Sequence, residues 1–137
     1  MLKFSERARE LLEEPLFGVL ATLNSDGSIQ QTTMWYQILP DDTILMNTTT
    51  RRVKYHNMRR NPHVSLCVQK GYQYVTISGC IEMINDADRG QQDIFRIARH
   101  YTGVEKALRY TQDVCSKQQR VTLLLKPEHA FEYFSQE

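Results

Sequence analysis

The chain has 137 residues, of which 41% are apolar and 24% are charged, and its net charge is +1. This length suits one domain, so we expect residues 1–137 to fold as a single unit around an ordinary core. The near-neutral charge gives no global reason to expect nucleic acid or an acidic membrane surface as a partner. No apolar run approaches the roughly 20 residues that span a bilayer, which together with a charged N-terminus predicts a cytoplasmic protein.

The first third of the chain predicts a short helix followed by strands. From Phe4 the apolar residues fall at helical spacing until Pro15, which ends the segment. Asp26-Gly27 is typical of a tight hairpin turn, and a second turn follows at Pro40. Three consecutive strands are therefore expected, as an antiparallel meander, over residues 17–23, 28–39 and 43–48.

The rest of the chain alternates between helical and extended patterns. Asn61-Pro62 ends a short helix that begins near Arg51, and Pro127 separates the last two strands. The further strands are expected over residues 64–69, 72–84, 120–126 and 129–134, and two further helices over residues 86–101 and 104–117. Together these elements predict a mainly β (α+β) fold. Its six to seven antiparallel strands close naturally into a barrel, with helices at the periphery.

A basic segment follows the third strand. Five of the 17 Lys and Arg residues lie between Arg51 and Arg60, with no acidic residue among them, directly after Thr48-Thr49-Thr50. A helix start offers free backbone N–H groups, and Arg52 and Lys54 add charge-assisted contacts, so the segment predicts a phosphate-binding site. The alternative interpretation is an exposed basic helix whose charges are simply solvated.

The order of these parts resembles the flavin-binding segment of the pyridoxamine 5′-phosphate oxidase-like superfamily. In that family a strand ending in small hydroxyl or amide residues precedes a basic pair around a lysine and a pattern such as Asn-x-x-x-Asn-Pro-x-Val-Ser-Leu. The matching residues here are Arg52, Lys54, Asn57 and Asn61-Pro62-His63-Val64-Ser65-Leu66. The hairpin residues 18–22, the pair Trp35-Tyr36 and residues 74–79 extend the resemblance to roughly residues 15–85.

The resemblance implies a split β-barrel that forms a homodimer with its cofactor at the dimer interface. The implied cofactor is FMN or the deazaflavin coenzyme F420. Such a protein is an oxidoreductase in which the cofactor transfers hydride or electrons to a small-molecule substrate, so no catalytic side chain is required. Non-catalytic flavin- or haem-binding modules, and pyridoxamine 5′-phosphate oxidase activity itself, remain as alternatives.

The resemblance also assigns residues to cofactor binding. Lys54 matches the lysine that contacts the phosphate, and Arg52 matches a second basic contact found in deazaflavin-binding relatives. Tyr74 stands where the oxidases carry glutamine, and Val53 stands where they often carry arginine; both departures disfavour vitamin B6 oxidase chemistry. The strand that faces the ring supplies Thr32, Thr33, Met34, Trp35, Tyr36 and Gln37, and the next strand supplies Asn47 and Thr48.

The sequence lacks the motifs that metal sites, P-loop or Rossmann nucleotide-binding sites and hydrolase active sites require. The three cysteines include no Cys-x-x-Cys pair and the four histidines show no His-x-x-x-His spacing, so we assign no metal. P-loop, Gly-x-Gly-x-x-Gly and Gly-x-Ser-x-Gly motifs do not occur. The aromatic residues Trp35, Tyr36 and Tyr74 have an alternative role as ordinary packing residues of strands. Nucleic-acid binding by residues 51–60 is a further alternative, although the protein as a whole is not basic.

Overall fold

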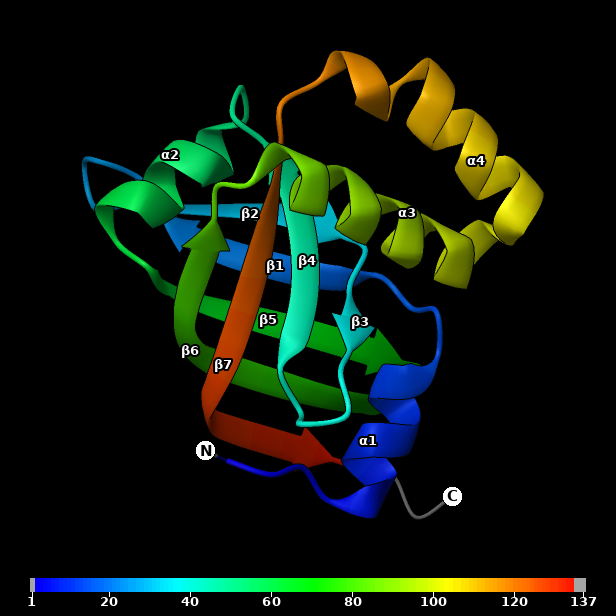
Figure 1. Ribbon diagram of the computed structural model, residues 1–137. Helices are drawn as coiled ribbons and strands as arrows, with labels where there is room; N and C mark the ends of the chain where they lie inside the picture. The colour runs from blue at the N-terminus through cyan, green and yellow to red at the C-terminus, as the bar shows by residue number, and fades with distance from the viewer. Residues whose placement is uncertain (1, 135–137) are drawn as a thin grey trace.

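The computed structural model describes residues 2–134, and its centre is a seven-stranded antiparallel sheet that curls into a half-barrel (Figure 1). The strands are β1 (Gly18–Leu23), β2 (Ile29–Met34), β3 (Gln37–Ile38), β4 (Ile44–Thr49), β5 (His63–Lys70), β6 (Gln73–Ile84) and β7 (Arg120–Tyr133). Their order in the sheet is β2-β1-β5-β6-β7-β4-β3. The strand-rich α+β fold predicted from the sequence is confirmed.

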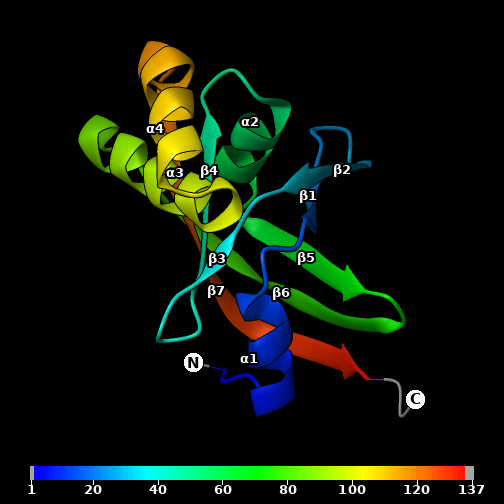
Figure 2. The same ribbon diagram turned by 90° about the vertical axis from the view of Figure 1, so that its right-hand side faces the viewer.

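Helices cover the two ends of the curled sheet (Figure 1). They are α1 (Glu6–Glu13), α2 (Val53–Arg60), α3 (Ala87–Thr102) and α4 (Val104–Asp113), followed by a 3-10 turn, η1 (Cys115–Lys117). In both ribbon views the end of β4 lies between α2 on one side and α3 with α4 on the other (Figures 1 and 2). None of these helices is long and apolar enough to cross a membrane.

The predicted meander is wrong at its second strand. Residues 28–39 are not continuous, because β2 ends at Met34 and β3 begins at Gln37, and these two strands occupy opposite edges of the sheet. Tyr36 does not pair with a neighbouring strand. It is 1% exposed and lies inside the barrel. Its backbone N–H donates a hydrogen bond to the hydroxyl of Tyr101 in α3 at 3.0 Å. A tertiary contact with a helix therefore replaces the strand pairing that the residue types favour.

The last strand also differs from the prediction, since Pro127 bends it without ending it. β7 runs through Pro127 and pairs with β6 on both sides, but the register shifts between Ser78 and Gly79. Ser78 pairs with His129 and Gly79 with Pro127, so Glu128 is the extra residue of a β-bulge. A Cβ atom on Gly79 would lie 2.2 Å from the Lys126 carbonyl oxygen. Glycine is thus required at the position where β7 turns (Figure 1).

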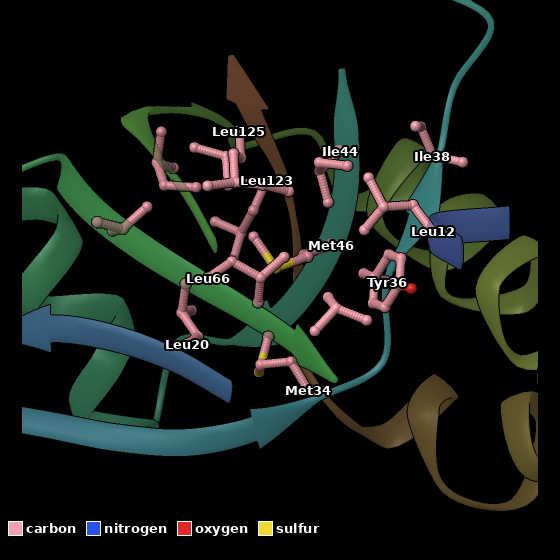
Figure 3. Close-up of a cluster of buried hydrophobic side chains, with 14 of the residues drawn as sticks. Leu12, Leu20, Met34, Tyr36, Ile38, Ile44, Met46, Leu66, Leu123 and Leu125 are labelled. Carbon is pink, nitrogen blue, oxygen red and sulfur yellow. The ribbon is translucent and has the colours of Figure 1, made fainter. Parts of the chain in front are cut away.

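The hydrophobic core fills the inside of the curl and is closed by α1 (Figure 3). Side chains from α1, β1, β4, β5 and β7 interdigitate there, and each full burial of such a side chain contributes about 1.5–3 kcal/mol. Its fully buried members include Leu12, Leu20, Tyr36, Ile44, Met46, Leu66, Leu123 and Leu125. α1 is held in place at its start, where the Ser5 side chain accepts the Ala8 N–H at 3.1 Å.

Close approach of α3 to β7 depends on Gly90. A Cβ atom at this position would lie 2.3 Å from the backbone oxygen of Arg120, so Gly90→Ala requires the helix or the strand to move. We expect this change to lower the free energy of unfolding by about 1–3 kcal/mol, which is typical of overpacking. Denaturant unfolding measures the effect. Gln92→Ala, on the exposed face of the same helix, is the control and should stay within about 0.5 kcal/mol of the parent; equal stability of both variants would contradict the expectation.

Candidate functional site

Three cationic side chains from two distant segments of the chain meet at the end of β4. Arg52 immediately precedes α2, Lys54 lies in the first turn of α2, and Arg120 is the first residue of β7. We call these residues the cation cluster. Arg52 is exposed, whereas Lys54 and Arg120 are each only 8% exposed. Within residues 2–134 none of the three forms an ion pair with a carboxylate.

Lys54 points into the protein. Its Nζ lies 3.4 Å from the Sδ atom of Met34, and burial, followed by the charges of Arg52 and Arg120, lowers the pKa of the Lys54 ammonium below its ordinary value. The interpretation of the segment as a solvated basic helix is therefore wrong for Lys54, although it fits Arg59, which is exposed. The first turn of α2 packs against the barrel, and that packing carries the lysine inward.

Neutral partners hold the buried Arg120. Its Nε donates to Asn47 Oδ1 at 2.8 Å, and a terminal guanidinium nitrogen donates to Gln118 Oε1 at 2.8 Å. Asn47 in turn donates from Nδ2 to the carbonyl of Gly90 at 2.9 Å. Burial lowers the pKa of Arg120, but a guanidinium stays charged in proteins. The site thus contains a fixed positive charge that no carboxylate within residues 2–134 compensates. The sequence did not indicate this charge, because no local motif distinguishes an arginine at a strand start.

Helix α2 is fastened to the β1–β2 hairpin by Asn57. Its Nδ2 donates to Thr22 Oγ1 at 3.1 Å and to Asn24 Oδ1 at 2.9 Å, while its Oδ1 accepts from Arg60 at 2.9 Å. Asn57 is 3% exposed and lies one turn after Lys54. This buried network sets the position of α2 and with it the position of the lysine.

A cavity of about 230 Å³ lies beside the cation cluster, and we call it the aromatic cavity. Its lining residues are Phe17, Thr33, Met34, Trp35, Asn47, Ile94, Ile97, Tyr110 and Arg120. Trp35 forms one wall, stacked on Tyr101 with ring centroids 5.0 Å apart and edge-on to Tyr110 at 6.0 Å. Cavities that hold small molecules usually measure about 300–1,000 Å³, so the aromatic cavity by itself offers only part of such a site.

A second, more polar cavity of about 500 Å³ lies between the start of α2 and η1, and we call it the basic cavity. Its lining residues are Thr49, Thr50, Arg51, Arg52, Lys117, Gln118 and Gln119. Arg52 belongs both to this cavity and to the cation cluster. The two cavities therefore adjoin the same group of charges.

The residues predicted to bind a cofactor divide into two groups. Those that lie together at the aromatic cavity or the cation cluster are Thr33, Met34, Trp35, Asn47, Arg52 and Lys54. Thr48 is buried in β4 next to Asn47 and lines neither cavity. Thr32, Tyr36 and Gln37 also lie outside both, and each has a buried oxygen without a hydrogen-bond partner within residues 2–134. Burial raises the pKa of the Tyr36 phenol.

Tyr74 lies on the outer face of the sheet, away from both cavities. It stacks on Phe131 and Tyr133 of β7, with ring centroids 6.0 Å and 5.6 Å apart. A row of residues in register crosses the same face over five strands: Thr33, Val19, Cys67, Thr76 and Phe131. We call this the outer row. It contains no charged residue, and its members Val19 and Phe131 are exposed apolar side chains.

Comparisons with known proteins agree with this fold. A family model described as pyridoxamine 5′-phosphate oxidase matches residues 4–134. The solved structure of an F420 reductase is 27% identical, with a TM-score of 0.75 over 93% of this chain and 98% of that one. A conserved hypothetical protein from Mycobacterium tuberculosis is 22% identical, with a TM-score of 0.79 over 96% and 86% of the two chains. HupZ from Group A Streptococcus, 14% identical with a TM-score of 0.67 over 95% and 94%, shares the fold. A search of the curated proteins finds no match.

Proposed function

This chain belongs to the pyridoxamine 5′-phosphate oxidase family, and from that premise we propose that it is an oxidoreductase that binds FMN or F420 through the phosphate of the cofactor. The observation that supports this most is the pair Lys54 and Arg120, two buried cations that have no carboxylate partner among the described residues. Burying a charge is costly unless a counter-charge compensates it. A ligand phosphate supplies that counter-charge, and Arg52 adds a third cation at the exposed side.

The aromatic cavity suits one end of a flat ring system. Trp35 and Tyr110 supply apolar and aromatic surface, and Asn47, fixed between Arg120 and the Gly90 carbonyl, supplies a polar edge. The bound cofactor would supply hydride or electron transfer, while the protein binds and orients it. The 27% identity to an F420 reductase favours F420, and FMN remains the second choice.

We further propose that two copies of the chain form the complete site. The aromatic cavity is too small for a whole flavin, and the uncharged outer row gives a surface on which a second copy can pack. Tyr74 lies on this outer face, so it could contribute to a cofactor site only from the other copy of the chain. Sedimentation at micromolar concentration should show twice the chain mass of 16.1 kDa; a clean monomer would contradict the shared site.

Binding should depend on the phosphate. FMN and riboflavin share the same ring, and charge-assisted contacts contribute about 1.5–3 kcal/mol, so FMN should bind about ten- to a hundredfold more tightly. Fluorescence titration of the purified protein with each ligand, and with F420, measures this. Equal dissociation constants for FMN and riboflavin would show that the protein has no phosphate site. If neither FMN nor F420 binds, the proposed function is wrong.

The lowered pKa of Lys54 predicts a pH dependence. As pH rises through that lowered value Lys54 loses its charge earlier than an ordinary lysine, whereas a phosphomonoester, with a second pKa of about 6, stays fully ionised at alkaline pH. FMN affinity should therefore fall at alkaline pH relative to riboflavin affinity, since the ratio cancels any titration of the ring. The free energy of unfolding of the cofactor-free protein should rise over the same interval, because the unfolded chain then binds more protons than the folded one. A flat FMN-to-riboflavin ratio would argue against contact with Lys54.

A further inference from the structure

The basic cavity carries more positive charge than one phosphate requires. Arg51, Arg52 and Lys117 line it, no carboxylate does, and none of the three has an ion pair in the described part of the chain. Arg52 belongs to the cation cluster, which leaves Arg51 and Lys117 without a function in the proposed phosphate site. The hydroxyl groups of Thr49 and Thr50 and two glutamine amides provide additional hydrogen-bond donors.

The walls of this cavity come from distant segments that are firmly joined. The Thr50 N–H donates to the Gln119 carbonyl at 3.3 Å, which ties the end of β4 to the segment before β7. From α3, the side-chain nitrogen of Gln91 donates to the carbonyls of Cys115 at 2.8 Å and Gln118 at 3.1 Å. The position of η1, and hence of the Lys117 backbone, is thereby fixed opposite the start of α2.

The two cavities are connected through one side chain. Gln118 lines the basic cavity, and its Oε1 accepts a hydrogen bond from Arg120, which lines the aromatic cavity. When the phosphate of a ligand contacts the cation cluster, the ligand atoms beyond that phosphate can therefore reach the basic cavity.

We propose that the basic cavity is a second anion subsite, which takes a further phosphate or carboxylate carried by the same ligand. The inference rests on the proposed function and adds the ligand class to it: cofactors with an acidic extension beyond the first phosphate bind better than FMN. Arg51 and Lys117 are the residues that select for the extension. Mutual repulsion between these cations is relieved when the second anionic group binds.

Two pairs of ligands test the subsite and identify the chemistry that it recognises. In the first pair, FAD is compared with FMN, from which it differs by a second phosphate and the group attached to it. In the second pair, F420 is compared with the same deazaflavin without its glutamate tail, so the two ligands differ by the carboxylates of that tail. The parent protein should bind the extended member of at least one pair about tenfold more tightly, as expected for one additional charge-assisted contact. A preference for FAD would show that the subsite recognises a phosphate, and a preference for F420 would show that it recognises a carboxylate.

The double variant Arg51→Ala/Lys117→Ala should abolish this preference and leave the FMN dissociation constant within about twofold, since neither residue contacts the first phosphate. Arg59→Ala/Lys106→Ala, which removes the same net charge from exposed positions on α2 and α4, is the control and should keep the preference. FMN binding without any preference in the parent, or equal losses in both double variants, would overturn the subsite alone. Failure of all four ligands to bind would overturn the proposed function together with the subsite.

Discussion

Lys54→Met should weaken FMN binding by about ten- to a hundredfold while the cofactor-free protein becomes no less stable than the parent. Methionine keeps the length and apolar character of the lysine stem but carries no charge. In the folded protein the Lys54 ammonium is buried against Met34 with no carboxylate partner within residues 2–134, so its removal relieves a desolvation cost. Loss of binding without loss of stability distinguishes a ligand-binding cation from a structural one.

Fluorescence titration and denaturant unfolding of the same variant measure the two effects. Arg59→Met is the matched control, because Arg59 lies on α2 as well but is exposed. It should change FMN affinity by less than about twofold and the free energy of unfolding by less than about 0.5 kcal/mol. If Lys54→Met and Arg59→Met bind FMN equally well, the phosphate does not contact Lys54. If Lys54→Met instead unfolds the protein, the lysine has a structural role that its surroundings do not reveal.

Val19→Asp should convert the proposed dimer to a monomer and weaken cofactor binding with it. Val19 is an exposed apolar member of the outer row, paired with Thr33 on β2 and with Cys67 on β5. A carboxylate buried there without a partner costs about 3–5 kcal/mol in a packed interface but little on a free surface. Sedimentation and FMN titration measure the two consequences.

Leu108→Asp is the control, because Leu108 is also an exposed apolar residue but lies on α4 and not on the sheet. It should leave both the mass of the particle and the FMN affinity unchanged. A Val19→Asp protein that stays dimeric would place the interface elsewhere. One that becomes monomeric yet binds FMN normally would show that each chain holds a complete site.

Local patterns predicted most of the secondary structure correctly. Most element ends lie within about two residues of the predicted bounds. This holds for the β1–β2 hairpin, for the helix that ends before Asn61-Pro62 and for both helices after β6, at most of their ends. These elements depend on features that are themselves local, namely turn residues, prolines and the spacing of apolar side chains. The same applies to the segment from Thr48 to Leu66, whose motif indicated the family that the comparison over residues 4–134 confirms.

Contacts between distant residues determined the rest. The strand expected over residues 28–39 is interrupted because Tyr36 packs inside the barrel and its backbone pairs with Tyr101, which no pattern within that segment encodes. Arg120 joins Lys54 only because β7 lies beside β4 in the sheet. Tyr74, in contrast, is carried to the outer face with Phe131.

By itself, therefore, the sequence determined the kinds of elements, the family and the lysine that we expect to contact phosphate, because each of these is expressed in neighbouring residues. The tertiary structure alone decided that this lysine is buried, that an arginine from the last strand shares its site, and that neither has a carboxylate partner in the part of the chain that the structure describes. The physical reason is that burial and charge compensation depend on everything packed around a side chain, and most of those neighbours come from elsewhere in the chain.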